Sequence, residues 1–116
     1  MNVSSIAGAE PFTTKDGSTI RELHHTDEQS LAEASLPAGA QTQRHFHAVT
    51  EEIYFLLEGT GEMEVDGSHQ RVGPGDAVLI PAGARHQITA ETALRFLCCC
   101  APAYSDADTF FDELEA

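Results

Sequence analysis

A chain of 116 residues, 41% of them hydrophobic, has room for one domain with a single modest core. Its 19 acidic and 6 basic residues give a formal net charge of -13, which disfavours nucleic acid and anionic membrane surfaces as partners. No apolar run approaches the roughly 20 residues of a membrane-spanning helix, and the N-terminal residues lack the basic and apolar regions of a signal peptide. We therefore expect a cytoplasmic protein.

Turn signals recur along the chain, and the runs between them have the length and composition of β-strands. Residues 1–30 are expected to form an N-terminal arm and the first strands. The later strand candidates are the runs SLAEASL, EEIYFLL, GEMEVD, DAVLI and ALRFLCCC. Many short strands at this spacing predict an all-β sandwich, jelly roll or small barrel. The only helix signal lies at residues 105–115, where Ser105 could act as the N-cap.

Two histidines separated by one residue form the first candidate site. In an extended strand alternate side chains point the same way, so His45 and His47 project together on either side of Phe46. Two imidazoles converging from one strand make a natural chelating pair, although such pairs also occur by chance on exposed strands. Glu51 and Glu52 follow, and parity turns Glu51 outward as a surface charge.

A second polar segment, PAGARHQI at residues 81–88, contains a turn followed by a third histidine, His86. With this segment the sequence resembles the cupin family. Residues 39–59 fit the first cupin motif, G-x5-H-x-H-x4-E-x6-G, at every fixed position. Residues 75–90 fit the second motif, G-x5-P-x-G-x2-H-x3-N, except that Ala90 replaces the final asparagine, which is not a metal ligand in the family.

The resemblance implies a jelly-roll barrel, also called a double-stranded β-helix, as a single cupin domain over residues 1–116. It also implies one divalent metal ion per chain inside the barrel. By position in the motifs, the ligands would be His45, His47, Glu52 and His86. Imidazole suits several transition metals, and the carboxylate shifts the preference toward harder ions, so iron or manganese is expected first and nickel or zinc next.

Strand parity also selects candidate pocket residues. Gln41 and Gln43 share the parity of the histidine pair, whereas Tyr54 and Leu56 share that of Glu52. Gln43 and Tyr54 are candidate catalytic residues because they would bring polar groups into the pocket, and Gln41 and Leu56 are expected to line it. Ordinary packing is the simpler interpretation of Tyr54, because no spacing argument singles it out.

The last predicted strand should place its arginine outward, because a buried Arg95 would need a partner. The inward positions would then be Leu94, Phe96, Cys98 and Cys100. Phe96 and Cys98 are expected near the metal ligands. The three consecutive cysteines are poorly placed for disulfides and are interpreted as small buried hydrophobic residues in a reducing compartment.

The remaining histidines are expected to be solvent-exposed loop residues rather than ligands. They are His24, His25 and His69. The run EEIYFLL is apolar on both faces, and its outward residues Ile53, Phe55 and Leu57 need a cover. Since an exposed apolar sheet is a common dimer surface, and since cupins commonly pair, we expect a homodimer.

The cupin fold supports many reactions, so function is less determined than fold. The leading interpretation is a metal-dependent enzyme that acts on a small oxygenated molecule, with a mononuclear oxygenase or dioxygenase as its first version. One alternative is a non-catalytic module that binds a metal or a small ligand. A sugar isomerase or a lyase is another, although no cluster of basic residues that would clamp a phosphate is evident.

Overall fold

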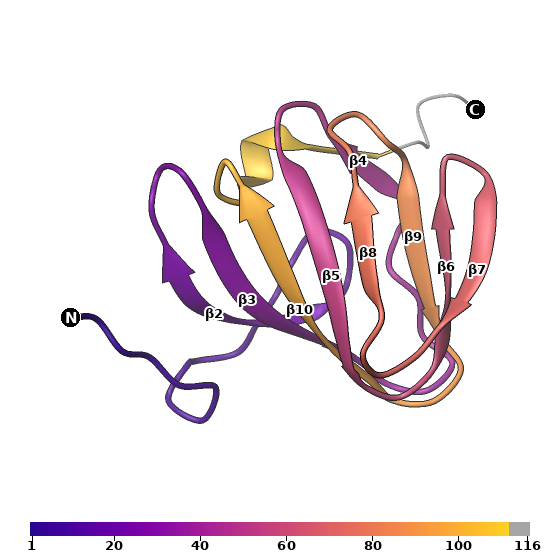
Figure 1. Ribbon diagram of the computed structural model, residues 1–116, viewed down its shortest axis with the longest axis horizontal. Helices are drawn as coiled ribbons and strands as arrows, with labels where there is room; N and C mark the ends of the chain where they lie inside the picture. Colours follow the sequence, from indigo (N-terminus) through magenta and orange to yellow (C-terminus); the bar gives the residue numbers. More distant parts are fainter. Residues whose placement is uncertain (112–116) are drawn as a thin grey trace.

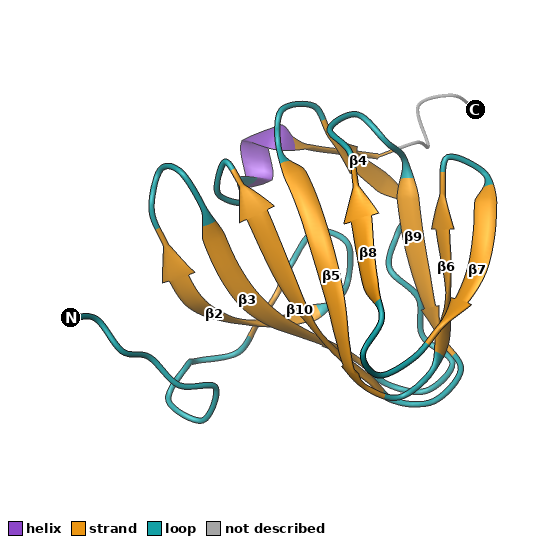
Figure 2. Ribbon diagram, viewed as in Figure 1, coloured by secondary structure: helices purple, strands orange, loops and turns teal. Residues whose placement is uncertain are grey.

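The computed structural model describes residues 1–111 as two antiparallel β-sheets that face each other (Figures 1 and 2). The first sheet has the strand order β1-β2-β3-β10-β5-β8, and the second has the order β11-β4-β9-β6-β7. The strands are β1 (Phe12–Thr13), β2 (Thr19–His25), β3 (Ser30–Leu36), β4 (His45–His47), β5 (Glu51–Glu58), β6 (Gly61–Val65), β7 (Ser68–Val72), β8 (Ala77–Ile80), β9 (His86–Ala90), β10 (Leu94–Ala101) and β11 (Thr109–Phe111). The predicted all-β jelly roll is confirmed.

The expected C-terminal helix is wrong over the part of it that the structure describes. Asp106–Asp108 form a single 3-10 turn, and the next residues form β11, which pairs with β4 so that Thr109 lies opposite His47. The hydrogen bonds of this ladder and the burial of Thr109 come from tertiary structure, which a local helix signal does not include. Residues 112–115 of the expected helix lie outside the described residues.

The inward side chains change character along the strands. On β5 they run from Glu52 through Tyr54 to Leu56, and all three are buried. β10 pairs antiparallel with β5, so its inward side chains follow the same order when they are read from its C-terminal end. They are Cys100, Cys98, Phe96 and Leu94. The interior therefore has a polar end, which holds the histidines, and an apolar end. The apolar end includes Leu36, Leu56, Met63, Ile88, Leu94 and Phe96.

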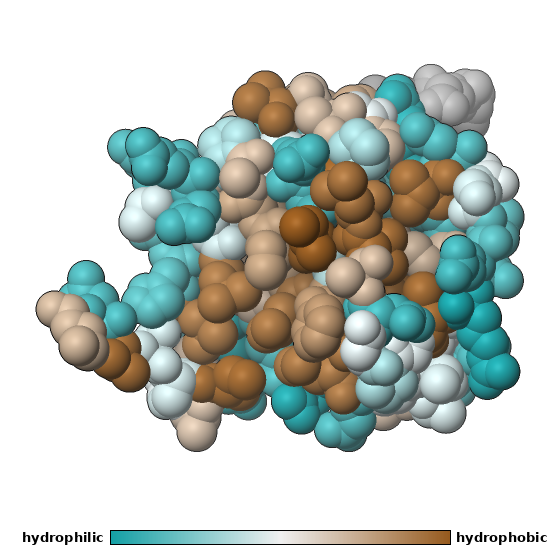
Figure 3. All heavy atoms as spheres, in the orientation of Figure 1, coloured by the Kyte–Doolittle hydropathy of each residue, from teal (hydrophilic) through white to brown (hydrophobic). Residues whose placement is uncertain are grey.

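The outer face of the first sheet carries apolar side chains in contact with solvent. Ile53 and Phe55 on β5 are 41% and 38% exposed, and Leu79 on β8 is 57% exposed. Ile53 and Leu79 are partners across the β5–β8 ladder, so the exposed groups are neighbours. Figure 3 shows apolar residues gathered over this face. Among residues 1–111 the structure has no helix with the length and apolar character of a membrane span.

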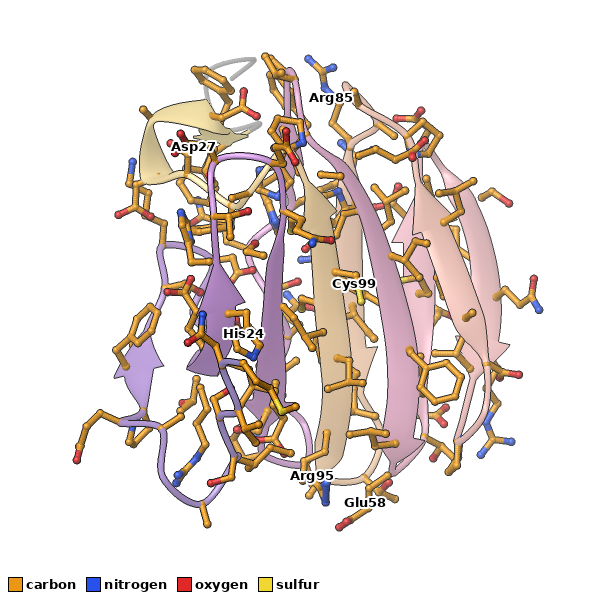
Figure 4. All side chains as sticks on the ribbon, turned by 60° about the vertical axis from the view of Figure 1, so that its left-hand side comes forward. His24, Asp27, Glu58, Arg85, Arg95 and Cys99 are labelled. Atoms are coloured by element: carbon orange, nitrogen blue, oxygen red, sulfur yellow. The ribbon has the colours of Figure 1, made fainter. Side chains whose placement is uncertain are left out.

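Two outward predictions can be followed in Figure 4, which shows Arg95 beside Glu58. Arg95 makes ion pairs with Glu58 at 3.1 Å and with Glu33 at 2.8 Å, so its charge is partnered at the sheet surface. His24 and Cys99 lie on the outer side of the first sheet in the same view. His24, His25 and His69 are exposed as expected, but they lie in strands β2 and β7 rather than in loops.

Candidate metal centre

Four buried side chains meet at the polar end of the interior. His45 and His47 come from β4, Glu52 from the start of β5, and His86 from the start of β9. The β4–β9 pairing places His45 opposite His86. The available ligand atoms of the three histidines all lie within 4.8 Å of one another. The two sequence motifs are thus brought to one point by strand pairing.

Each of the three imidazoles is held by its Nδ1 atom against a backbone carbonyl. The acceptors are Gln43 for His45 (2.7 Å), Asp108 for His47 (3.1 Å) and Ala84 for His86 (3.0 Å). A carbonyl oxygen can only accept, so Nδ1 carries the proton and Nε2 keeps a free lone pair. The backbone therefore sets the tautomer that a metal ligand needs.

Glu52 faces two of these nitrogens. Its Oε1 lies 3.4 Å from Nε2 of His47 and 3.5 Å from Nε2 of His86. Its Oε2 accepts a hydrogen bond from the Cys100 thiol at 3.4 Å. Glu52 Oε1 and His86 Nε2 are buried and have no hydrogen-bond partner among the described residues. Converging buried acceptors are costly without a cation between them, so these residues fit a divalent metal ion.

Burial and charge act on the protonation of this cluster. Burial, reinforced by repulsion from His86, lowers the pKa of His45 to about 4. Burial would raise the pKa of Glu52, but the imidazoles of His47 and His86 outweigh it and lower that pKa to about 2. Burial likewise acts to lower the pKa of His47, yet the Glu52 carboxylate outweighs it and raises that pKa. At neutral pH Glu52 is ionised and His45 is neutral, the forms that bind a metal.

The turn between His47 and Glu52 is shaped by a residue from the C-terminal segment. The Asp108 carboxylate accepts hydrogen bonds from three consecutive backbone N–H groups, those of residues 48–50. The donor–acceptor distances are 3.0 to 3.2 Å. Asp108 also supplies the carbonyl that orients His47, so one residue fixes a ligand and the loop that follows it. The role of Asp108 was not predicted from the sequence, because residues 105–115 were interpreted only as a helix.

Comparison with known proteins assigns the family. A family model described as Cupin domain matches residues 32–100, more than half of the chain. The chain belongs to the cupin family. Both motifs and all four candidate ligands of this cupin fall inside the matched range.

Individual relatives agree with this assignment. An uncharacterized protein of Methanocaldococcus jannaschii is 45% identical over 106 residues, which is 85% of either chain. An oxalate-binding protein of Thermotoga maritima is 32% identical over 79 residues, covering 66% of this cupin and 65% of that protein. A solved RmlC-like cupin from Shewanella frigidimarina superposes with a TM-score of 0.84 at 20% identity, over 92% of this chain and 96% of that one, which shows the shared fold.

A cavity opens beside the candidate ligands of this cupin. The volume open to the centres of water molecules is about 40 Å³. At 10–15 Å³ for each water, this is room for roughly three waters or for a small organic molecule. Of the predicted pocket residues, Tyr54, Phe96 and Cys98 line it together with His45, His47 and Glu52. The cavity therefore suits a small substrate.

Three other predicted pocket residues lie elsewhere. Gln41 and Gln43 are exposed and do not line the cavity. The parity argument failed there because β4 begins at His45, and in the preceding segment it is Thr42 that is buried. Gln43 contacts the site through its backbone carbonyl and N–H, so its side-chain amide is not placed for the predicted catalytic role. Leu56 is fully buried in the apolar end and does not line the cavity either.

The side chains beside the candidate ligands hold their protons. Tyr54 packs against Phe96 with ring centroids 4.7 Å apart, and burial raises its pKa well above the ordinary range. Burial also raises the pKa values of Cys98 and Cys100. At neutral pH these groups therefore carry their protons, so they present neutral hydroxyl and thiol groups and no phenolate or thiolate.

Two further lining residues were missed by sequence reasoning. Asp16 lies in the turn between β1 and β2, with Oδ2 3.6 Å from Nε2 of His45. Tyr104 follows β10 and places its ring against His47, with centroids 5.9 Å apart. Both lie outside the two cupin motifs. The Asp16-Gly17 turn signal was visible, but nothing local shows that this turn folds over the cavity.

Proposed function

We propose that this cupin is a metal-dependent enzyme that acts on a small oxygenated molecule. One divalent ion would be held by His45, His47, His86 and Glu52. The observation that carries the proposal is the convergence of the buried Glu52 Oε1 and His86 Nε2, which have no hydrogen-bond partner among the described residues. Such a pair is stabilised by a shared cation and destabilised without one.

A mononuclear oxygenase, with iron or manganese, is the specific activity we favour. The ligand set supports these ions, because three imidazoles and one carboxylate offer nitrogen and oxygen donors without thiolate. When bound, the metal would supply Lewis acidity and a place for dioxygen beside the substrate. The cavity lies on the side of Glu52 and the two β4 histidines, so a substrate in it would contact the same centre.

The chain itself would bind, orient and shield the substrate. Phe96 and the Tyr54 ring form an apolar wall, which excludes water and strengthens polar contacts inside. Because the Tyr54 hydroxyl keeps its proton, it would donate a hydrogen bond to a substrate oxygen rather than remove a proton. Cys100 would hold Glu52 through the thiol contact to Oε2 and leave Oε1 aimed at the imidazoles.

The test is elemental analysis of untagged protein, followed by oxygen uptake with a panel of small enols, phenols and thiols. Iron or manganese near one ion per chain, with uptake that depends on the added compound, is the expected result. Metal without oxygen uptake on any compound would contradict the oxygenase version. Failure to bind any divalent metal after reconstitution would contradict the whole proposal.

A second candidate function is a non-catalytic small-ligand binding module. The observation in its favour is the relative from Thermotoga maritima, whose name describes oxalate binding. Oxalate binding to the metal-loaded protein, with no product formed on long incubation, would favour this candidate. A sugar-phosphate isomerase is less well supported, because no Lys or Arg lines the cavity within residues 1–111.

We also propose that the outer face of the first sheet joins two copies of the chain in a homodimer. The exposed side chains of Ile53, Phe55 and Leu79 belong to adjacent strands and form one apolar surface. A two-fold pairing would cover this surface with its own equivalent. Analytical ultracentrifugation is expected to show a dimer, and Phe55→Glu is expected to give a monomer. A monomeric wild-type protein would contradict this proposal.

A further inference from the structure

The turn that carries Asp16 holds its carboxylate in one orientation. Oδ1 accepts three hydrogen bonds, from the Thr14 hydroxyl at 2.7 Å and from the Ser18 hydroxyl and backbone N–H at 2.7 and 2.9 Å. The Asp16 carbonyl accepts from the Gln43 N–H at 2.8 Å. With Oδ1 and the backbone both anchored, Oδ2 is the oxygen left to face His45 in the cavity.

Two acceptors oppose each other at this point. His45 has its proton on Nδ1, which donates to the Gln43 carbonyl, so its Nε2 presents a lone pair. Asp16 Oδ2 lies 3.6 Å away and, as a carboxylate oxygen, also presents lone pairs. The separation is too long for a hydrogen bond, and no proton lies between the two atoms in this tautomer. In the metal-free protein the gap is complementary to a hydrogen-bond donor or a cation. When a metal ion takes the His45 lone pair, Asp16 Oδ2 remains as an acceptor in the cavity lining.

The charge of the cavity lining also favours a hydrogen-bond donor or a cation. Its lining includes the carboxylates of Asp16, Glu22 and Glu52, and no Lys or Arg within the described part of the chain. Glu22 lies toward solvent, where it pairs with His25 at 3.0 Å. Glu52 faces the imidazoles and would be offset by a bound metal ion. In the metal-free protein the Asp16 charge repels carboxylates and phosphates, and in the metal-loaded protein it cancels the positive charge that Glu52 leaves on a divalent ion, which weakens the attraction of anions.

We propose that Asp16 determines the class of substrate that this site accepts. Its Oδ2 accepts a hydrogen bond from a hydroxyl or ammonium group of a small neutral or cationic substrate, and its charge disfavours anionic ones. This inference rests on the proposed function of the metal centre. Asp16 is a specificity residue in this scheme, since the metal ligands are complete without it.

The experiment compares two small probes of similar size, acetoin and oxalate. Acetoin is neutral and carries a hydroxyl group beside a carbonyl, whereas oxalate is a dianion. Their dissociation constants are measured by NMR titration of the wild-type protein, Asp16→Asn and the control Asp27→Asn. Asp27 is exposed in the β2–β3 loop (Figure 4) and does not line the cavity, so the control makes the same change in charge outside it. Each titration is done on metal-free and on metal-loaded protein.

Asp16→Asn is expected to weaken acetoin binding about tenfold, the effect of one hydrogen bond to a charged group. It should also strengthen oxalate binding, because a repulsive charge is gone. The control should change neither constant, and Asp16→Asn should take up as much metal as wild type. If Asp16→Asn does not fold, Asp16→Glu is measured instead. This variant should bind acetoin more weakly than wild type and should still disfavour oxalate, because its charge is kept.

Several results would overturn the inference. The first is an unchanged ratio of the acetoin and oxalate dissociation constants in Asp16→Asn. The second is a loss of metal from that variant, which would make Asp16 a ligand. The third is a wild-type protein that binds neither probe. The proposed function fails by a separate measurement, which is the absence of metal uptake by the wild-type protein. The probe ratio on metal-free protein still reports on Asp16 in that case.

Discussion

The two ends of the barrel interior are built on the same strands yet differ in chemistry. At the apolar end Leu56 and Ile88 are fully buried among other hydrocarbon side chains. At the polar end, two to four residues away on the same strands, Glu52 and His86 are as deeply buried but face each other as acceptors. Burial therefore stabilises the fold at one end and holds an unfavourable arrangement at the other. Stability and metal binding should respond separately to substitution.

The largest expected effect is a loss of stability from the apolar end. Leu56→Ala removes a fully buried side chain and leaves a cavity, which should lower the free energy of unfolding by about 2–5 kcal/mol. Chemical denaturation measures this change. The matched control is Leu57→Ala, one position along on the outer face, which should cost less. Loss of metal from the folded fraction of Leu56→Ala would contradict the separation of the two ends.

The next effect concerns the polar end. His86→Asn removes an Nε2 ligand and should lower metal affinity by about 100-fold or more. Competition with a chromophoric chelator measures the affinity. Unfolding of the metal-free variant should stay close to that of the metal-free wild type, since the unpartnered acceptor pair is relieved. His69→Asn, at an exposed histidine, is the control, and equal metal loss in both variants would contradict the assignment of the site.

A smaller effect is expected from the residue that shapes the ligand loop. Asp108→Ala leaves the carbonyl contact to His47 in place but removes the acceptor for the N–H groups of residues 48–50. Metal affinity should fall about tenfold, as for other residues that position ligands. Asp27→Ala serves as the control. Unchanged affinity in Asp108→Ala would show that the loop keeps its shape without the carboxylate.

The smallest effect is a pH-dependent one beside the site. A short ion pair to Arg44, at 2.7 Å, lowers the pKa of Glu64 below its ordinary value of 4.5. A lowered carboxylate pKa contributes stability that is complete above the unfolded pKa and is lost as the pH falls through the folded one. Glu64→Gln should thus be less stable than wild type by roughly 1 kcal/mol at neutral pH. The difference should shrink below about pH 4.5, and a constant difference would contradict this cause.

Much of the fold follows from local patterns in the sequence. Alternation on the last long strand correctly placed Leu94, Phe96 and Cys98 inward, because period-two burial is a property of a single strand. The structure also brings together the three motif histidines. Alternation failed at Gln41 and Gln43, because parity holds only where the chain is regularly extended and this segment is not a strand.

The missed residues share a physical reason. Asp16 and Asp108 reach the site through contacts between segments far apart in the chain, and those contacts depend on how the β1–β2 turn and β11 dock. No residue near either of them in sequence is a candidate ligand. Propensity and spacing describe neighbours along the chain, so they could identify the ligands but not the groups that orient them or face them.

The hydrogen bonds from the loop at residues 48–50 to Asp108 limit how short a functional segment of this cupin can be. A segment with only the two motifs, residues 39–90, would contain every candidate ligand. It would lack the Asp108 carboxylate, which holds the chain between His47 and Glu52, and the Asp108 carbonyl, which orients the His47 ring. The motifs thus carry the ligand identities, while the shape of the centre belongs to the folded domain. Transplanting the motifs into another barrel would transfer the ligands without their alignment.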